Sequence, residues 1–483
     1  MAANFLHGVE TIELDIGPRP IRGVKTAVVG IVGTAPMLDV AAGDRTLNSF
    51  KLITNDRDAR RYFGSDRTGF SLPWALDAIF DQGNGPIVLA VNVLDPATHV
   101  TEAADEVLTL DANGTVQLAH PQVSALVIKS SDGAATRALG TDYTVDLAEG
   151  KVTKVAGLVT GDKATYNWLD PSLITSADII GEVDGAGDRT AMQSFLDTYQ
   201  ELGFYPKLLV NPGFSSANAV ATEMQVMATK LRAIALIDAP IGTTVQDAIT
   251  GRGPAGSINF NYSGDRMVLC YPHVKKYDPA TDSELLRPMS PCLAGRFGAT
   301  DQARGYWWSA SNQEILGITG VEIKLTSMIN DPTTETNLLN EAGIVTLFNS
   351  FGTGIRTWGN RSAAWPTLTH PRNFINIRRT ADVIHESIEY SMLQFLDAPI
   401  TDALIDAITE SVNMFLRTLI MRGALIDGKC LWDKSKNPYT EIALGHLTFD
   451  VIFMPPPPLE RITFESFIDI KMLQALTGVI GQR

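Results

Sequence analysis

The sequence is poor in the residues from which most catalytic and metal sites are built. Its 483 residues include 3 cysteines and 7 histidines. No CxxC, HExxH or GxSxG motif occurs, and no glycine-rich loop ends in Gly-Lys-Ser or Gly-Lys-Thr. These absences argue against a zinc site, a serine hydrolase and a P-loop nucleotide-binding protein. We therefore predict a protein without cofactors and without enzymatic activity.

Long apolar runs and an excess of positive charge are also missing. No run of about 18 apolar residues is present, so we expect no direct membrane insertion. The segment Met1–His7 lacks the basic and apolar regions of a secretory signal, so the protein is expected to start in the cytoplasm of its cell. With 39 basic and 54 acidic residues, the net charge of −15 argues against a nucleic-acid partner.

The remaining candidates for chemistry are weak. Gly30 to Pro36 is a glycine-bearing turn after an apolar run, but it lacks the GxGxxG spacing and is interpreted as a tight strand exit. His370 and His385 stand apart from any nucleophile motif. Glu386 and Glu389 have the spacing of a solvated helix face. An α/β enzyme such as a hydrolase, and a surface-layer or capsid protein, are kept as alternatives.

The three cysteines leave two interpretations open. Cys270 lies in an apolar run and is expected to be a core thiol, as is Cys430. Cys292 follows Ser290-Pro291 and is expected in a loop. An odd number leaves at least one cysteine without a partner in its own chain, so both free thiols and intersubunit disulfides are compatible with the sequence.

An isolated strand pattern stands at each end of the chain, attached through a proline-containing spacer. Ile12, Leu14 and Ile16 alternate with polar residues, which predicts a half-buried strand before Gly17-Pro18-Arg19-Pro20. Near the other end, the four prolines of Pro455–Pro458 cannot belong to a helix interior or a central strand. They separate an alternating strand at 447–453 from a second strand-like segment, Leu459–Ile470, which contains Ile462, Phe464 and Ile468.

The pattern between these two arms predicts a multidomain α/β (α+β) protein. Apolar strand-like runs alternate with helical segments up to residue 99 and again from residue 190. Short alternating runs and turns fill 100–182, and the overlapping stretch 101–190 carries 14 acidic against 6 basic residues. Helices are expected at 382–396 and from the N-cap Thr401 to Met421. The predicted division is an N-terminal arm (1–20), an α/β middle domain (21–99 with 183–300), an inserted acidic all-β outer domain (100–182), an inner C-terminal α/β domain (301–458) and a C-terminal arm (459–483).

One basic cluster stands out from the acidic background. It contains Arg372, Arg378 and Arg379 within the stretch 371–379. These arginines could pair with acids of their own chain. Alternatively, they could contact an acidic partner surface, where they would set the orientation of docking.

Several stretches together resemble the tail sheath proteins of contractile-tailed bacteriophages and the related R-type tailocins. They are His7–Val9 with Ala27–Ala35, Leu338–Ile344, Trp358–Ser362, Asn376–Thr380 and a middle segment from Ala294-Gly295 through Asp301, Gly305 and Trp307. Their order, together with the two arms, carries the resemblance, which covers roughly 21–99 and 183–483.

The resemblance implies a structural subunit that forms stacked hexameric rings around a tail tube, contracts, and drives the tube through the host envelope. It implies assembly in the host cytoplasm into the virion tail, with the tube, baseplate and tail terminator proteins as further partners. Each arm would add a strand to a sheet of a neighbouring subunit, and Arg372, Arg378 and Arg379 would face the tube. The sequence of one subunit does not distinguish a phage sheath from a tailocin sheath.

Overall fold

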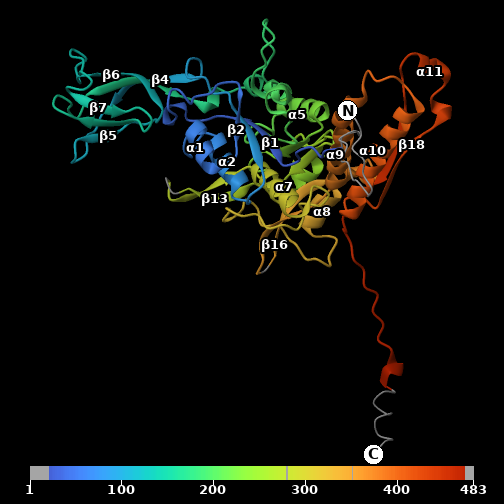
Figure 1. The fold of residues 1–483 in the computed structure, drawn as a ribbon. Helices are drawn as coiled ribbons and strands as arrows, with labels where there is room; N and C mark the ends of the chain where they lie inside the picture. Colours follow the sequence, from blue (N-terminus) through green and yellow to red (C-terminus); the bar gives the residue numbers. More distant parts are fainter. Residues whose placement is uncertain (1–20, 279–280, 351, 474–483) are drawn as a thin grey trace, which may run out of the picture.

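The computed structural model describes residues 21–278, 281–350 and 352–473. The molecule is elongated, with small β-sheets at one end, a large α/β layer in the middle, and a helix pair with a β-hairpin at the other end (Figure 1). The C-terminal segment leaves the body beside this helix pair and runs away from it (Figure 1). These three regions are therefore arranged in a row.

An eight-stranded sheet forms the middle of the molecule. The strands lie in the order β17-β16-β12-β11-β10-β1-β3-β2, parallel except for β2 and β17 at the two edges. They are β1 (Val28–Gly33), β2 (Phe50–Ile53), β3 (Ile87–Asn92), β10 (Leu208–Val210), β11 (Ile234–Asp238), β12 (Met267–Cys270), β16 (Ile344–Ser350) and β17 (Gly354–Trp358). The central strands are apolar on both faces, because helices cover the sheet from both sides.

Two apolar cores lie on opposite faces of this sheet. Val28 and Val32 of β1 belong to one core, and Val29 and Ile31 belong to the other. The first core is covered by α3 (Ser176–Ile180), the 3-10 segment Ala191–Leu196, α5 (Asn218–Leu231), α6 (Val245–Thr250) and α8 (Glu335–Glu341). The second is covered by α1 (Asp56–Phe63), α2 (Leu72–Phe80) and α7 (Ser290–Arg304). A short helix, α4 (Thr198–Leu202), and the small sheet of β13 (Val274–Asp278), β14 (Ser283–Arg287) and β15 (Gly320–Val321) complete this part.

The sheet crosses the boundary predicted at residue 300. β16 pairs with β12 in parallel, and β17 pairs with β16, so residues 344–358 extend the sheet of the middle region. The separate C-terminal part begins only after this pair. These strands were not recognisable as members of the sheet, because β16 joins it through β12, which lies far away in the sequence, and β17 joins it through β16.

Residues 100–169 form two three-stranded antiparallel sheets outside the main layer. Their strands are β4 (Val100–Val107), β5 (Thr115–Gln117), β6 (Val123–Lys129), β7 (Tyr143–Asp146), β8 (Lys151–Lys154) and β9 (Lys163–Leu169). They share an apolar cluster of their own, which includes Val123, Val152 and Tyr166. β4 and β6, the two edges of the sheet around β9, both carry a register shift typical of a β-bulge. We call residues 100–169 the β module.

The C-terminal part is built from two long helices and a hairpin. α9 (Ile375–Met392) begins seven residues earlier than the sequence pattern predicts. α10 (Asp402–Met421) begins as expected after Thr401, whose hydroxyl accepts a hydrogen bond from the Leu404 N–H. β18 (Asp427–Trp432) and β19 (Phe449–Met454) pair with each other, and α11 (Tyr439–Ala443) lies in the loop between them. Their apolar side chains pack with α9 and α10 in one cluster.

Gly295 marks the close approach of α7 to α2. A Cβ at this position would lie 2.4 Å from the carbonyl oxygen of Ile79. We expect Gly295→Ala to lower the free energy of unfolding by about 1–3 kcal/mol, although alanine is the better helix former. Gly43→Ala is the control, because its Cβ meets no atom within 4 Å. Chemical denaturation of the two variants measures the difference, and equal stability would contradict this account of the helix contact.

Candidate assembly surfaces

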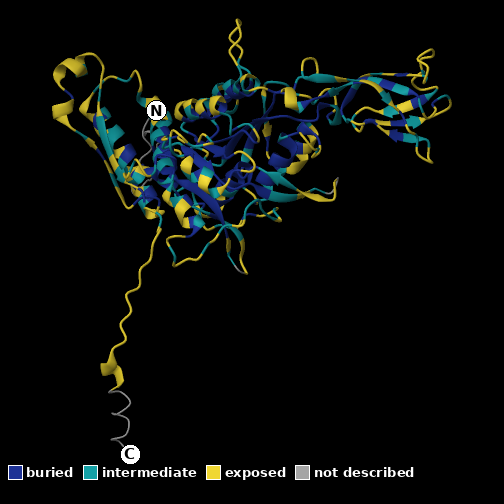
Figure 2. Ribbon diagram, turned by 180° about the vertical axis from the view of Figure 1, so that it is seen from behind, coloured by how far each residue is buried: buried dark blue, intermediate teal, exposed yellow. Residues whose placement is uncertain are grey.

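The C-terminal segment places large apolar side chains in solvent. Residues 459–469 form neither helix nor strand, and a short 3-10 turn follows at Ile470–Leu473. Ile462, Phe464 and Ile468 are 63%, 87% and 99% exposed. Figure 2 shows the described part of this segment exposed along its length beyond the body. The corresponding N-terminal residues, Ile12, Leu14 and Ile16, lie outside the described residues.

The exposed segment has the side-chain pattern of a strand without a sheet. Ile462, Phe464 and Ile468 are separated by even numbers of residues, so they share one face in an extended conformation. Covering an aliphatic or aromatic side chain of this size stabilises a contact by about 1.5–3 kcal/mol. The segment therefore carries an unsatisfied apolar face, which a second molecule could cover.

The hairpin β18–β19 has one edge occupied by a side chain. The amide of Asn413 in α10 accepts from the Cys430 N–H at 2.7 Å and donates to the Cys430 carbonyl oxygen at 3.1 Å. Cys430 lies opposite Val451 of β19. The backbone N–H and C=O of Cys430 both bond to the Asn413 side chain. Cys430 and Val451 are therefore a non-hydrogen-bonded pair of the antiparallel ladder, in which the backbone groups of each residue point away from the other strand.

The outer edge of β19 is consequently the open edge of the hairpin. The N–H and C=O of Val451 point away from β18, and by alternation so do those of Phe449 and Phe453. Among the described strands, β18 is the partner of β19, and no second one lies beside it. An open strand edge next to a partly buried apolar cluster is a template for another strand.

The three arginines of the basic cluster differ in their surroundings. Arg379 is 5% exposed and pairs with Asp301, with 2.6 Å between Nη2 and Oδ2. Arg378 is 14% exposed and pairs with Asp382 at 2.7 Å. Both arginines thus have an acidic partner in their own chain, which favours the pairing interpretation, and their contact with a tube stays a prediction. Arg372 is 54% exposed and lies 3.9 Å from Asp265, so it can reach a partner.

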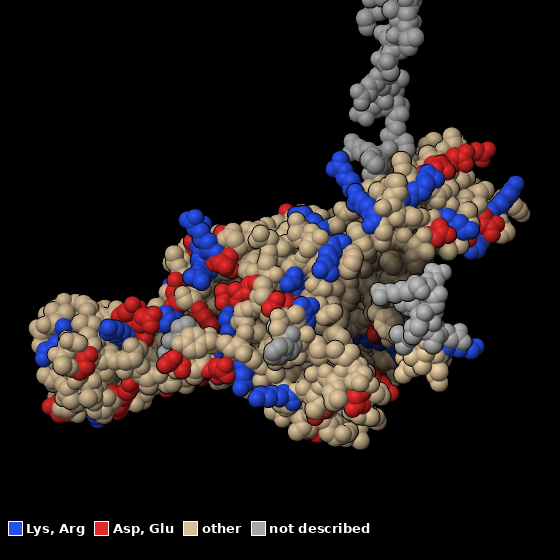
Figure 3. Space-filling model, turned by 90° about the horizontal axis from the view of Figure 1, so that it is seen from below, with Lys and Arg blue, Asp and Glu red and all other residues tan. Residues whose placement is uncertain are grey.

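Charges of both signs are mixed on the surface. Figure 3 shows basic side chains interspersed with acidic ones over the face seen from below. A cleft of about 320 Å³ between α1, α2 and the β13–β14 hairpin has four aspartates among its nine lining residues, including Asp66 and Asp77. Lys276 pairs with Asp77 and Arg287 with Asp66, so these carboxylates are held by neighbouring cations.

All three cysteines are buried free thiols. Cys292 lies in the first turn of α7, not in the predicted loop, because Ser290-Pro291 starts a helix there. Burial raises the pKa of Cys292 to about 12 and that of Cys430 to about 11, and it holds the pKa of Cys270 well above its usual value. A buried thiol that stays protonated reacts slowly with a second sulfur. The burial therefore argues against disulfides between subunits.

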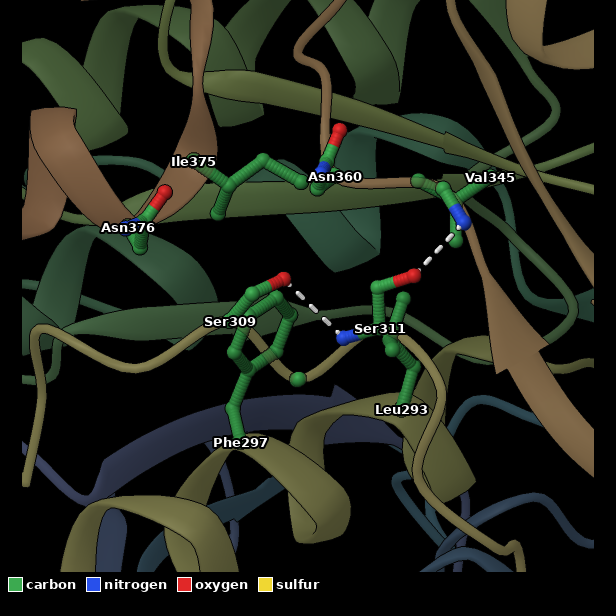
Figure 4. A pocket seen from close by; sticks show the side chains of 10 residues that line it. Leu293, Phe297, Ser309, Ser311, Val345, Asn360, Ile375 and Asn376 are labelled. Atoms are coloured by element: carbon green, nitrogen blue, oxygen red, sulfur yellow. Dashed lines mark hydrogen bonds between the residues drawn. The ribbon is translucent and has the colours of Figure 1, made fainter. Parts of the chain in front are cut away.

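A small cavity lies between α7, β16 and the start of α9. Its volume is about 10 Å³, room for one water molecule at most. Figure 4 shows Ser309 and Ser311 at this cavity, where the Ser309 hydroxyl accepts from the Ser311 N–H and the Ser311 hydroxyl accepts from the Gly359 N–H. Its lining contains asparagine and apolar residues but no histidine or acid that could activate a serine.

Two other kinds of site are absent from the described part of the chain. No group of three or more His, Cys, Asp or Glu side chains there is arranged to hold a metal ion. None of its helices is long and apolar enough to cross a membrane.

Models of three protein families match the chain in succession. The phage tail sheath protein central domain matches residues 175–363, and the phage tail sheath C-terminal domain matches residues 369–469. The boundary between them falls close to the point where the central sheet ends. A model described as a protein of unknown function matches residues 92–175, which contain the β module.

The fold is that of contractile sheath proteins. The helical sheath of the anti-feeding prophage in its contracted state has a TM-score of 0.59 with this chain, at 16% identity, and the match covers 97% of this chain and 100% of the other. The sheath of an extracellular contractile injection system in its contracted state has a TM-score of 0.58 at 14% identity, covering 98% and 100%.

Sequence relatives give the family. The tail sheath protein of Burkholderia phage BcepMu is 51% identical over 99% of this chain and 100% of its own length. The tail sheath protein of Escherichia phage P2 is 27% identical over 99% of both chains. The chain belongs to the phage tail sheath protein family, and it is a structural subunit of the contractile tail rather than an enzyme.

Burial of the thiols leads to a direct chemical test. We expect the folded subunit to react slowly with Ellman's reagent and to release 3 equivalents only after unfolding, since all three cysteines are buried. Non-reducing gels of assembled particles should show monomeric bands. A disulfide-linked dimer band would instead show that a thiol becomes accessible during assembly.

Proposed function

We propose that the subunits of the sheath are joined by strands donated to the open edge of β19. The C-terminal segment 459–470 is the donor, and the N-terminal segment around Ile12, Leu14 and Ile16 is a second one. The observation that carries the proposal is the match between an exposed strand-like segment with an apolar face and an open strand edge beside an apolar cluster. Within one subunit, the C-terminal segment could pair with the β19 edge only if it folded back onto its own hairpin.

The energetic gain from such an exchange is sufficient for a stable polymer. A six-residue strand adds about six backbone hydrogen bonds, each contributing about 1 kcal/mol net. Covering Ile462, Phe464 and Ile468 adds about 1.5–3 kcal/mol for each side chain. Part of this gain is offset by ordering the segment, yet two arms per subunit provide two such contacts.

The arrangement in Figure 1 suggests which end of the subunit faces outwards. The β module and the hairpin region lie at opposite ends of the long axis. We propose that the C-terminal part forms the inner wall against the tail tube and that the β module is the outer domain. The acidic composition of the segment that contains the module supports this placement, because like charges on neighbouring copies keep the outer surface solvated.

Contraction then requires no nucleotide or metal. The extended lattice is a metastable arrangement, and the arms hold neighbouring subunits together while the bodies slide into a tighter one. Stacked hexameric rings around the tube, with the baseplate and tail terminator proteins at the two ends, complete the proposed assembly. The same task falls to this subunit in a phage tail or in a headless tailocin.

Deletion of either arm separates folding from assembly. We expect variants lacking residues 1–17, or everything after Pro458, to remain folded monomers with an unchanged unfolding midpoint, because the cores of the described chain are formed by residues that both variants keep. Electron microscopy should show no sheath tubes for either variant. Tubes of normal length from either truncation would refute strand donation by that arm.

The exposed Arg372 provides the test of tube contact. We expect Arg372→Glu to reduce extended sheath–tube assembly but to allow empty contracted sheath, because charge reversal disturbs docking more than folding. Arg57→Glu on the surface of α1 is the control and should assemble as the unchanged protein does. Equal numbers of extended tails from both variants, counted by microscopy, would remove Arg372 from the tube interface.

A further inference from the structure

The two arms leave the body at opposite ends of one helix. At the C-terminal end of α9, the Val24 N–H donates to the Ser387 hydroxyl at 3.3 Å and the Arg22 N–H to the Ser391 hydroxyl at 3.4 Å. The N-terminal arm therefore starts there. At the other end, Phe374 is the N-cap residue of α9 and contacts the residue that holds the C-terminal arm, Arg361.

Arg361 is itself fixed in position on three sides. Its guanidinium lies between the rings of Trp365, at 3.9 Å, and Phe374, at 4.2 Å, and donates to the Asn373 side chain at 3.0 Å. Two further N–H groups donate to the carboxylate of Glu460, one of them at 2.8 Å. Such a planar two-bond pair fixes direction as well as distance.

Glu460 is the point where the C-terminal segment loses contact with the body. Five residues earlier, Pro455 is buried directly after β19. Pro455–Pro458 is therefore held at both ends, by the hairpin before it and by Arg361 after it. The four prolines thus form a short spacer that is anchored to the body at both ends, and the described part of the arm without contacts to the body begins at Arg461.

α9 is bound along its length to the central sheet. Its acids Asp382, Glu386 and Glu389 follow one face of the helix at intervals of four and three residues. Their partners are Arg266, Lys207 and Arg232, and each of these basic residues stands one or two positions before a parallel strand, β12, β10 and β11 respectively. We call these three pairs the α9 ion-pair row. The α9 ion-pair row holds α9 across the N-terminal ends of these strands. The roots of the two arms lie at opposite ends of this helix.

We infer that the Arg361–Glu460 pair is a clamp that sets the direction in which the C-terminal arm leaves the subunit, and that α9 holds this clamp at a fixed distance from the root of the N-terminal arm. Eighteen helical residues span about 27 Å at 1.5 Å per residue. The inference deepens the proposed strand donation and rests on it. A neighbour pulling on one arm would thereby act on the other arm through a rigid helix.

The clamp can be removed without disturbing the fold. Glu460→Gln removes the carboxylate, while Glu465→Gln removes a carboxylate of the same exposed segment that has no ion-pair partner among the described residues. Spin labels at Thr463→Cys and Met421→Cys report the distance between arm and body in the full-length subunit below the polymerisation concentration. The native thiols are buried and do not compete for the label.

We expect one narrow distance distribution for the labelled parent and for Glu465→Gln, and a broad one for Glu460→Gln. The concentration needed for polymerisation should rise about two- to fivefold for Glu460→Gln alone, the range expected from losing one exposed ion pair. An equal thermal unfolding midpoint for the two variants shows that the body is intact. Identical behaviour of both variants in the distance and polymerisation measurements would overturn the clamp.

The deletion after Pro458 separates this inference from the proposed function. If that deletion abolishes tubes while Glu460→Gln behaves like Glu465→Gln, the arm donates a strand but the clamp does not direct it. If the deletion leaves tubes intact, strand donation by the C-terminal arm is itself wrong, whatever the clamp does.

Discussion

The attachment of α9 to the end of the central sheet is the interaction on which the rest of the subunit depends. The Lys207 amine and the Glu386 carboxylate are 7% and 6% exposed and lie 2.5 Å apart. Burial lowers the pKa of Lys207, and the adjacent carboxylate acts in the opposite direction. A pair this deeply buried tolerates loss of one partner poorly, because the other charge would remain without compensation. The C-terminal part, with its hairpin and both arm roots, is consequently positioned by charge pairs in addition to Ile375, which packs into the second apolar core.

The body of the subunit and its hairpin with the two arms have different roles in the proposed assembly. The sheet with its two cores supplies a packed body, and under the proposed strand donation the hairpin and arms would supply the contacts with other copies. In the proposed assembly, the apolar residues that are exposed on the isolated arm would be buried by a neighbour. Folding of the body and growth of the polymer would then depend on different residues.

Much of the sheet and the helix pair could be predicted from local pattern. The apolar runs of β1, β3 and β11 and the N-cap Thr401 are local signals, and the structure confirms the elements they predict. The place of β16 and β17 in the central sheet could not be predicted, since it depends on pairing across more than 70 residues with β12. β18 was also missed, because Asp427–Trp432 shows no alternation of apolar and polar residues.

The candidate interface was predictable in outline but not in its chemistry. The alternation of Ile462, Phe464 and Ile468 after four prolines predicts a separate extended segment, and in the isolated subunit residues 459–469 form no strand. The roles of the arginines depend on which acids the fold brings near them. Arg378 and Arg379 meet Asp382 and Asp301, and Arg361, which was recognised only as part of a family motif, meets Glu460 about 100 residues later.

The bulges in β4 and β6 of the β module have a consequence for an assembly of many copies. A chain that assembles by strand addition carries a risk that any regular sheet edge will accept a wrong strand. β4 and β6 interrupt their ladders with bulges, and the edge strand β17 is covered by residues 312–315, whose backbone bonds to it. The outer edge of β19 is regular, and no other described strand pairs with it. In the proposed assembly, the bulges and the covered edge of β17 would make strand addition at those edges less favourable than at β19.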